Sequence, residues 1–255
     1  MVRYERNQLF TGRDALLARL NKKFRTPSTE AYHGRIALFG LEGIGKTQIA
    51  LEYVYRFQRS YQRIYWIPGD TQASLLGGYK QIAERAELQT SHLSTAVEVA
   101  ERVISWLEQE EGWLLVVDNL NNIKVLSMGQ NSNLKLLLLP STGDLQHTLI
   151  TTRNPHYGDI PAQGMEICKY DRDASIQLLY KSSRITPLNQ PELQAAERIV
   201  EKLCNLPLAI DQAAAYIREM EISFSKFLIL YEEYRRDLTK WGPKGPQQYP
   251  YTDST

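Results

Sequence analysis

One octet in the chain, GLEGIGKT at residues 40–47, has the composition and spacing of a phosphate-binding loop. The residues that fit the pattern G-x-x-x-x-G-K-[ST] are Gly40, Gly45, Lys46 and Thr47. Glycines let backbone N–H groups approach phosphate oxygens, and the start of the following helix adds partial positive charge. We expect Lys46 to reach the β- and γ-phosphates and Thr47 to ligate Mg²⁺. The alternative interpretation is a glycine-rich turn with a solvated lysine.

A second polar position, Asp118, follows the apolar run WLLVV. A phosphate loop needs a carboxylate on its magnesium side at the end of another buried strand, so Asp118 is predicted to share the metal with Thr47. Alternatively, Asp118 caps the next helix. Hydrolases of this type often carry an acid at the next position, where this chain has Asn119. Because an amide orients water but cannot take its proton, we expect hydrolysis to be slow or to depend on another base.

Two further charged residues bear on the γ-phosphate. Arg153 ends the apolar run TLITTR, where a guanidinium distinguishes a triphosphate from a diphosphate; the alternative is an ordinary surface arginine. Glu42 is a carboxylate inside the phosphate loop. It either points to solvent, replaces the acid missing at Asn119, or repels the γ-phosphate and favours ADP. Unit charges about 4 Å apart interact by roughly 4 kcal/mol at an effective dielectric of about 20, which is enough to shift nucleotide preference.

The elements that must position these residues alternate between strand and helix. We predict strands at 35–39, 63–68, 112–119 and 147–153, and helices at about 46–61, 71–88 and 94–111. An apolar run at 134–140 is predicted to form a short helix. Strands that alternate with helices imply right-handed crossovers and a parallel sheet covered on both faces. The fold class is therefore α/β, a three-layer phosphate-loop NTPase.

Strand patterns cease after about Tyr170, and a small all-helical bundle is predicted. Its helices are expected at 171–183, 191–203, 207–221 and 223–241, with Pro191 and Pro207 near helix starts, where proline is tolerated. The proline- and glycine-rich stretch at 242–255 is expected to be a linker. We therefore divide the chain into an N-terminal segment (1–34), a nucleotide-binding domain (35–165), a helical subdomain (166–241) and the linker.

Composition limits the partners and the compartment expected for the protein. The 255 residues include 43% hydrophobic residues and carry a net charge of +1, so the chain can build cores and has no overall field that favours nucleic acid or an anionic membrane. Cys168 and Cys204 have no metal-binding spacing, and the N-terminus has no apolar signal core. The longest apolar runs are too short to span a bilayer. We expect a cytoplasmic protein with neither nucleic acid nor membrane as a partner.

Four motifs in order resemble the NB-ARC family of nucleotide-binding switches, part of the STAND class of P-loop ATPases. They are FTGRDALLARL at 10–20, GLEGIGKT, LLVVDN together with LITTR, and NLPLAI at 205–210. The similarity covers nearly the whole chain, and the stretches LPLAIDQAAAYI and LLLLPSTGDLQHTLITTR look like the fungal branch. Asn205 stands where the family usually has glycine. Because asparagine readily adopts a left-handed backbone, we expect the turn to be preserved.

The resemblance implies ADP or ATP with Mg²⁺ as the ligands. It places Phe10, Gly12 and Arg13 by the adenine and ribose, and Pro207 over the adenine, so that the nucleotide joins the two domains. Without the other motifs, the preferred interpretation is that Arg13 is a surface charge at a helix start and Pro207 a simple helix opener. The full set of nucleotide contacts implied is Phe10, Gly12, Arg13, Gly40, Gly43, Ile44, Gly45, Lys46, Thr47, Gln48 and Pro207.

The function implied is an ATP/ADP switch of an NLR-like signalling protein in innate immunity or programmed cell death. Nucleotide exchange would control conformation and self-association, and hydrolysis would be slow. The effector, winged-helix and sensor domains of the family are expected outside this chain. One alternative is an active AAA-like motor ATPase, which needs an acid beside Asp118. Another is the core of a STAND transcription regulator, whose DNA-binding module would also lie outside the chain.

Overall fold

The structure, a computed structural model, describes residues 4–26, 32–128, 136–137, 139–140, 142–154 and 160–238. The chain divides into two compact units. The first unit comprises Met1–Arg6, Asp14–Gly40 and Lys46–Ile167, and the second comprises Asn7–Arg13, Leu41–Gly45 and Cys168–Thr255. The N-terminal motif and the middle of the octet therefore cluster with the C-terminal part of the chain, so that neither unit is a continuous segment of sequence.

Within the described ranges, the first unit contains a sheet of five parallel strands in the order β2-β3-β6-β1-β7. The strands are β1 (Arg35–Phe39), β2 (Arg63–Pro68), β3 (Trp113–Asp118), β6 (Gln146–Thr152) and β7 (Gln163–Glu166). The first four confirm the predicted strands. The sequence gives no indication of β7, because QGME has neither β-branched residues nor an apolar alternation.

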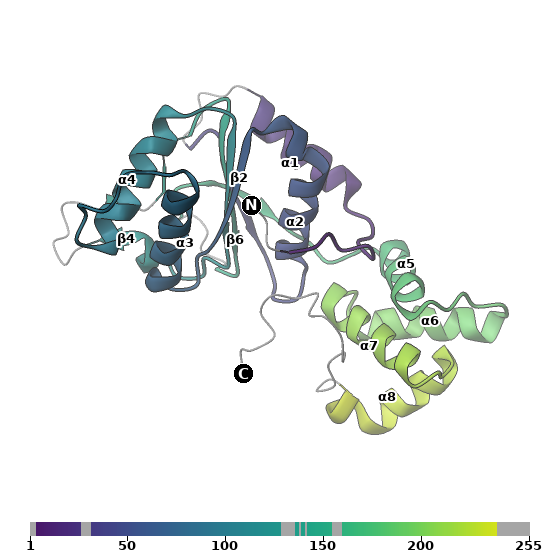
Figure 1. The fold of residues 1–255 in the computed structure, drawn as a ribbon. Coiled ribbons are helices and arrows are strands. Elements are labelled where there is room, and N and C mark those ends of the chain that lie inside the picture. The colour runs from purple at the N-terminus through teal and green to yellow at the C-terminus, as the bar shows by residue number, and fades with distance from the viewer. Residues whose placement is uncertain are drawn as a thin grey trace. The chain divides into compact units, whose positions relative to one another are not determined.

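Four helices flank this sheet, with α1 and α2 on one side and α3 and α4 on the other (Figure 1). They are α1 (Asp14–Arg25), α2 (Lys46–Phe57), α3 (Gln72–Arg85) and α4 (Ala96–Gln109). The predicted helix over 46–61 ends as α2 at Phe57, followed by the 3₁₀ turn η1 (Gln58–Ser60). A capping box between Thr95 and Glu98 fixes the start of α4. The three-layer α/β fold is therefore as predicted.

The predicted short helix at 134–140 is wrong where the structure describes it. Leu136–Leu137 forms strand β5, which pairs antiparallel with β4 (Ser127–Met128). Residues 134, 135 and 138 lie outside the described residues. A short run of leucines suits a buried strand as well as a helix, and periodicity alone does not separate them, so the available strand partner decides.

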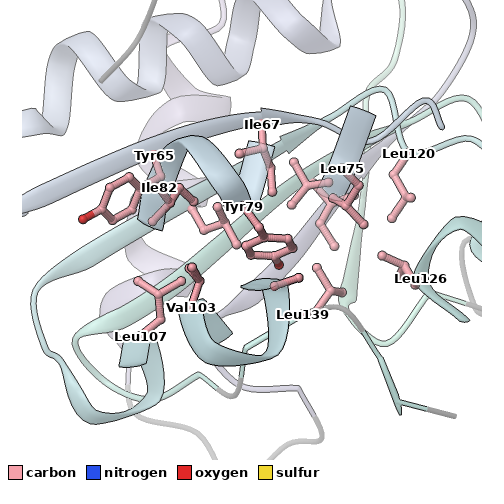
Figure 2. Packing of buried hydrophobic residues seen from close by; sticks show 14 of the residues in the cluster. Tyr65, Ile67, Leu75, Tyr79, Ile82, Val103, Leu107, Leu120, Leu126 and Leu139 are labelled. Carbon is pink, nitrogen blue, oxygen red and sulfur yellow. The ribbon is translucent and has the colours of Figure 1, made fainter. Parts of the chain in front are cut away.

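The core between the sheet and the α3–α4 pair is continuous and apolar. Figure 2 shows Tyr79 and Ile82 of α3, Val103 and Leu107 of α4, and Ile67 of β2 directed into the same interior. Each fully buried side chain of this size contributes about 1.5–3 kcal/mol relative to its exposed state. This packing fixes the strands whose carboxyl ends carry the polar residues of interest.

The N-terminal residues hold α2, the helix that starts with Lys46 and Thr47. Arg6 donates two hydrogen bonds to the Glu52 carboxylate, at 3.0 and 2.8 Å, and Arg56 donates a third at 2.7 Å. Burial alone would raise the pKa of Glu52, but these arginine hydrogen bonds leave the pKa below its usual value. Glu52 therefore stays ionised and ties the N-terminal segment to α2.

Strand β6 is anchored near its amino end by His147. Its Nδ1 is 2.8 Å from the Tyr61 hydroxyl, which is 2.9 Å from the Tyr53 hydroxyl, and its ring stacks on Phe24. Burial lowers the pKa of His147 to about 4. His147 is therefore neutral at neutral pH, and the strand that ends at Thr152 begins in a buried aromatic cluster.

The second unit is a helical bundle, as predicted. Its helices are α5 (Arg172–Ser183), α6 (Gln190–Lys202), α7 (Pro207–Glu219) and α8 (Phe224–Leu238). Leu179, Ile199, Ile210, Ile217 and Phe224 are among the buried side chains that form its core. The linker prediction for 242–255 falls outside the described residues. Among the residues that are described, no helix has both the length and the apolar character needed to cross a membrane.

Candidate functional site

The octet begins where β1 ends and closes where α2 begins. Gly40 has a φ of +146°, and a Cβ at this position would lie 2.7 Å from the Ile167 carbonyl oxygen, so only glycine fits. Lys46 is 8% exposed, and its Nζ donates to the Gly40 carbonyl oxygen at 2.8 Å. The Lys46 side chain, at the start of α2, therefore reaches back across the loop to the end of β1.

At the carboxyl ends of β3 and β6, Asp118 accepts two hydroxyl hydrogen bonds. Thr47 Oγ1 donates to its Oδ1 at 2.9 Å, and Thr151 Oγ1 donates to the same oxygen at 2.5 Å. Asp118 is completely buried. The register explains the contact, because Val117 pairs with Ile150 and so brings the next residues of both strands together. Asp118 thus joins two strands and the start of α2.

Two asparagines extend this contact along the sheet edge. The Asn119 N–H donates to Thr151 Oγ1 at 2.8 Å, and Asn121 Nδ2 donates to Asn119 Oδ1 at 2.7 Å. Asn121 Oδ1 in turn accepts from the N–H of Arg153 at 2.7 Å. Asn119 has a φ of +66°, which asparagine tolerates better than most residues. We call Thr47, Asp118, Asn119, Asn121 and Thr151 the carboxyl-edge network.

Thr47 and Asp118 supply oxygen atoms of the kind that Mg²⁺ prefers. In the structure these two oxygens are joined directly by the 2.9 Å hydrogen bond. In the described part of the chain no group of three or more His, Cys, Asp or Glu residues is arranged to hold a metal. A site with so few protein ligands suits an ion that also binds substrate phosphates.

In the second unit, Arg13 and Tyr170 connect the N-terminal motif to the residues before α5. The Arg13 guanidinium lies 4.3 Å from the centre of the Tyr170 ring, and its Nη2 donates to the Cys168 carbonyl oxygen at 2.7 Å. The Tyr170 hydroxyl donates to the Thr11 carbonyl oxygen at 2.7 Å. Burial lowers the pKa of Arg13, and the neighbouring Tyr170 opposes this shift. The Arg13 guanidinium is therefore partly buried. The Tyr170 ring lies against its face, and the Cys168 carbonyl oxygen accepts a hydrogen bond at its edge.

The middle of the octet is bound to the start of α7. The Leu208 N–H donates to the Gly43 carbonyl oxygen at 3.1 Å. Gly43 has a φ of +72°, and a Cβ there would lie 3.1 Å from the Leu208 Cβ. Asn205, two residues before Pro207, has a φ of +54° as predicted, and its carbonyl oxygen accepts from the Tyr170 N–H at 3.3 Å. We call Arg13, Gly43, Tyr170, Asn205 and Leu208 the helical-unit cluster.

The residues predicted from sequence fall in both units. Those in the first unit are Gly40, Lys46, Thr47, Gln48, Asp118, Asn119 and Arg153, and those in the second are Phe10, Gly12, Arg13, Glu42, Gly43, Ile44, Gly45 and Pro207. The structure brings Thr47 and Asp118 together, whereas Glu42 is exposed. Sequence reasoning missed Thr151, Asn121, Tyr170 and Leu208. Of these four residues, only Thr151 could have been suspected from sequence, because it lies inside the run TLITTR.

Known proteins resemble this chain in sequence and in fold. No protein-family model matches the chain. A curated protein of Hyaloscypha variabilis, described as a nucleotide-binding leucine-rich repeat (NLR)-like protein, is 29% identical over 244 residues. The match covers 91% of this chain and 24% of that relative, so the chain spans about a quarter of the relative's length.

Solved structures share the fold at low identity. The ORC2 protein of Aeropyrum pernix, in ADPNP–ADP complexes, has a TM-score of 0.56 and 12% identity, covering 94% of this chain and 74% of that one. A STAND protein with a tetratricopeptide repeat sensor from Pyrococcus horikoshii has a TM-score of 0.53 and 15% identity, covering 85% of this chain and 31% of that one. The predicted resemblance is therefore supported in sequence by the NLR-like relative, and a STAND protein shares the fold.

Proposed function

We propose that this chain is the ATP/ADP-binding switch module of an NLR-like signalling protein. The observation that carries the proposal is the hydrogen bond between Thr47 and Asp118, which unites the octet with the acidic strand end 71 residues away. The NLR-like relative and the STAND protein that shares the fold support the same assignment.

The residues of the first unit are suited to the phosphates. Backbone N–H groups of the octet and the start of α2 supply positive potential, and Lys46 supplies a full charge. Thr47 and Asp118 would hold Mg²⁺, which neutralises phosphate charge when bound. Arg153 is the residue directly after β6, and we propose that it senses the γ-phosphate. These roles together distinguish a triphosphate from a diphosphate.

The residues of the second unit are suited to the base and sugar. Phe10, Gly12, Arg13 and Pro207 are proposed to recognise the adenine and ribose. Lys181 Nζ donates to the Phe10 carbonyl oxygen at 3.1 Å, and Tyr170 donates to Thr11, so the backbone of the N-terminal motif is fixed within its unit. A fixed backbone favours recognition because less conformational entropy is lost on binding.

Slow hydrolysis follows from the residue beside Asp118. Asn119 has no carboxylate, and its side-chain oxygen already accepts a hydrogen bond from Asn121. Proton abstraction from water by this side chain is excluded, so nucleotide exchange would set the state of the switch. Glu42 remains a candidate either for a substitute base or for repelling the γ-phosphate. Replacement with glycine separates these roles, because loss of a base slows hydrolysis, whereas loss of repulsion tightens ATP binding.

In the whole protein, we propose that exchange of ADP for ATP changes the conformation and promotes self-association, with effector and sensor domains outside this chain and a cytoplasmic location. A nucleotide biases two conformations only by its differential affinity for them. The γ-phosphate is the chemical difference between the two ligands, so the proposal requires that Arg153 contribute to that differential affinity.

Calorimetry with ADP and ATP in the presence of Mg²⁺ tests the proposal. The parent chain is expected to bind both nucleotides, and Lys46→Ala is expected to abolish binding. Lys80→Ala, the same substitution at an exposed position of α3, is the matched control and should bind as the parent does. ADP affinity retained by Lys46→Ala would overturn the site. Rapid steady ATP turnover by the parent would favour the motor ATPase over the switch.

A further inference from the structure

A run of hydrogen bonds leads from Asp118 to the backbone of Arg153. Thr151 Oγ1 donates to Asp118, the Asn119 N–H donates to Thr151 Oγ1, and Asn121 Nδ2 donates to Asn119 Oδ1. The last step is from the Arg153 N–H to Asn121 Oδ1. The first bond is short, at 2.5 Å, and the other three distances are 2.7 or 2.8 Å, within the range of well-formed hydrogen bonds.

Asn121 uses both ends of its carboxamide in this run. Its oxygen fixes a residue 32 positions away in sequence, and its nitrogen fixes a residue two positions away. No other natural side chain of the same length presents one donor and one acceptor in this arrangement, because aspartate has only acceptors and leucine has neither. The Asn121 amide therefore matches two specific groups: the side-chain oxygen of Asn119, just after β3, and the N–H of Arg153, just after β6.

The position of the Arg153 backbone determines where its long side chain starts. Arg153 follows the last residue of β6, beyond the strand pairing that would otherwise hold its N–H. The side-chain oxygen of Asn121 supplies that constraint instead. A displacement at this point moves the origin of the side chain that carries the guanidinium, and charge-assisted contacts depend strongly on distance and direction.

We propose that Asn121 is a positioning residue that sets the place of Arg153 and thereby the discrimination between adenosine tri- and diphosphates. The proposal rests on the proposed nucleotide-switch function and adds the residue that couples the Asp118 strand end to the sensing arginine. Asn121 is not a catalytic residue, because it acts through Arg153 and through Asn119.

The test compares ATP and ADP affinities, with Mg²⁺, for the parent, Asn121→Ala and Asn121→Asp. For Asn121→Ala we expect ATP affinity to fall about tenfold and ADP affinity to change less than about twofold, the size expected for one displaced charged contact. Asn121→Asp keeps an acceptor for the Arg153 N–H but sets a carboxylate oxygen against Asn119 Oδ1. It should therefore also lose ATP selectively.

Asn119→Gly provides a second route to the same result. Glycine accepts the φ of +66° at this position and removes the oxygen that orients the Asn121 amide. We expect a selective loss of ATP affinity that is smaller than that of Asn121→Ala. Thermal unfolding of each variant checks that the fold is retained. If an Asn121 variant unfolds, Asn119→Gly takes its place in the comparison.

A double-mutant cycle with Arg153→Ala decides whether Asn121 acts through the arginine. Once Arg153 is removed, Asn121→Ala should have no further effect on ATP affinity, which makes the two changes non-additive. Full additivity, or equal losses of ATP and ADP, would overturn the proposal and leave Asn121 with a purely structural role. Failure of the parent to bind either nucleotide is a different result, which removes the proposed function itself.

Discussion

The carboxyl-edge network and the helical-unit cluster use different kinds of hydrogen-bond acceptor. In the carboxyl-edge network, the acceptors are side-chain oxygens: the carboxylate of Asp118, the hydroxyl of Thr151 and the amide of Asn119. In the helical-unit cluster, Arg13, Tyr170 and Leu208 all donate to backbone carbonyl oxygens. Every acceptor in the first region depends on residue identity, whereas the acceptors in the second are backbone groups whose positions depend on the shape of the chain.

This difference has an energetic consequence. Asp118 is a completely buried carboxylate, so the loss of one of its two hydroxyl donors leaves its burial less well compensated in a medium of low dielectric. A backbone carbonyl is neutral and often finds water instead. We therefore expect side-chain substitutions to cost more in the carboxyl-edge network, and changes of backbone conformation to matter more in the helical-unit cluster.

The largest effect is predicted for Thr151→Val. Valine has the shape of threonine but cannot donate to Asp118 or accept from the Asn119 N–H. The buried Asp118 carboxylate and the part-buried Asn119 N–H each lose a partner, so we expect the free energy of unfolding to fall by about 4 kcal/mol. Chemical denaturation measures this loss. Thr151→Ser keeps the hydroxyl and should cost about 1 kcal/mol; equal costs for the two variants would contradict the importance of these hydrogen bonds.

The same contrast explains how much of the site could be predicted from sequence. Lys46, Thr47, Asp118 and Arg153 could be singled out because their side-chain types suit the proposed roles in recognisable motifs. The alternating pattern of strands and helices predicted the helix start and the strand ends at which they lie. Leu208 contributes only its N–H and Gly43 only its carbonyl oxygen, groups that almost every residue has. The hydrogen bond itself requires no particular side chain at either end, so it becomes visible only once the chain is folded.

The fold shows the same limit. Strands β1 and β3 were predictable as buried, mainly apolar runs, and β2 and β6 from their aromatic and β-branched residues. Strand β7, in contrast, is held by pairing to β1 with the residues QGME. β5 was predicted as helix because a leucine run carries no period that separates the two states. In both cases tertiary pairing decided the conformation, and local sequence did not contain that information.

Acid should weaken the first unit through His147, which lies on the same strand as Thr151. Burial lowers the pKa of His147 from 6.5 to about 4. Between these values the unfolded chain binds a proton that the folded chain does not, so the stability present above pH 6.5 is lost as pH falls toward 4. The expected loss is about 3 kcal/mol between pH 7 and pH 4.

Tryptophan fluorescence during denaturation is a suitable measurement, because Trp66, Trp106 and Trp113 belong to the first unit. The residues assigned to the second unit include no histidine, so the helical-unit cluster should not share this acid response. His147→Asn keeps a polar group near Tyr61 and should show a weaker pH dependence. A parent whose stability is unchanged down to pH 4 would disprove the role of His147.

Gly43→Ala is predicted to cost about 2 kcal/mol, because it affects backbone shape in the helical-unit cluster. A left-handed φ of +72° disfavours alanine by about 1 kcal/mol, and the added Cβ meets Leu208 at 3.1 Å. Gly45→Ala is the matched control, since its φ of +93° is also left-handed but a Cβ there meets nothing within 4 Å.

The difference between the two glycine variants isolates the contact with α7. Gly45→Ala should cost about 1 kcal/mol less than Gly43→Ala in denaturant unfolding. Leu208→Ala in the Gly43→Ala background leaves the Cβ of residue 208 in place, so relief should be partial. Identical costs at the two glycines would show that helix α7 does not restrict the loop.

The smallest effect is predicted for Tyr170→Phe. This change removes the hydrogen bond to the Thr11 carbonyl oxygen but keeps the ring beneath the Arg13 guanidinium. Because the acceptor is neutral, the free energy of unfolding should fall by only about 1 kcal/mol, a quarter of the loss expected for Thr151→Val. Tyr170→Leu also removes the aromatic face and should cost about 1 kcal/mol more. Denaturant unfolding of all three variants places the two regions on one scale. If Tyr170→Phe cost as much as Thr151→Val, the charge of the acceptor would not be what separates the carboxyl-edge network from the helical-unit cluster.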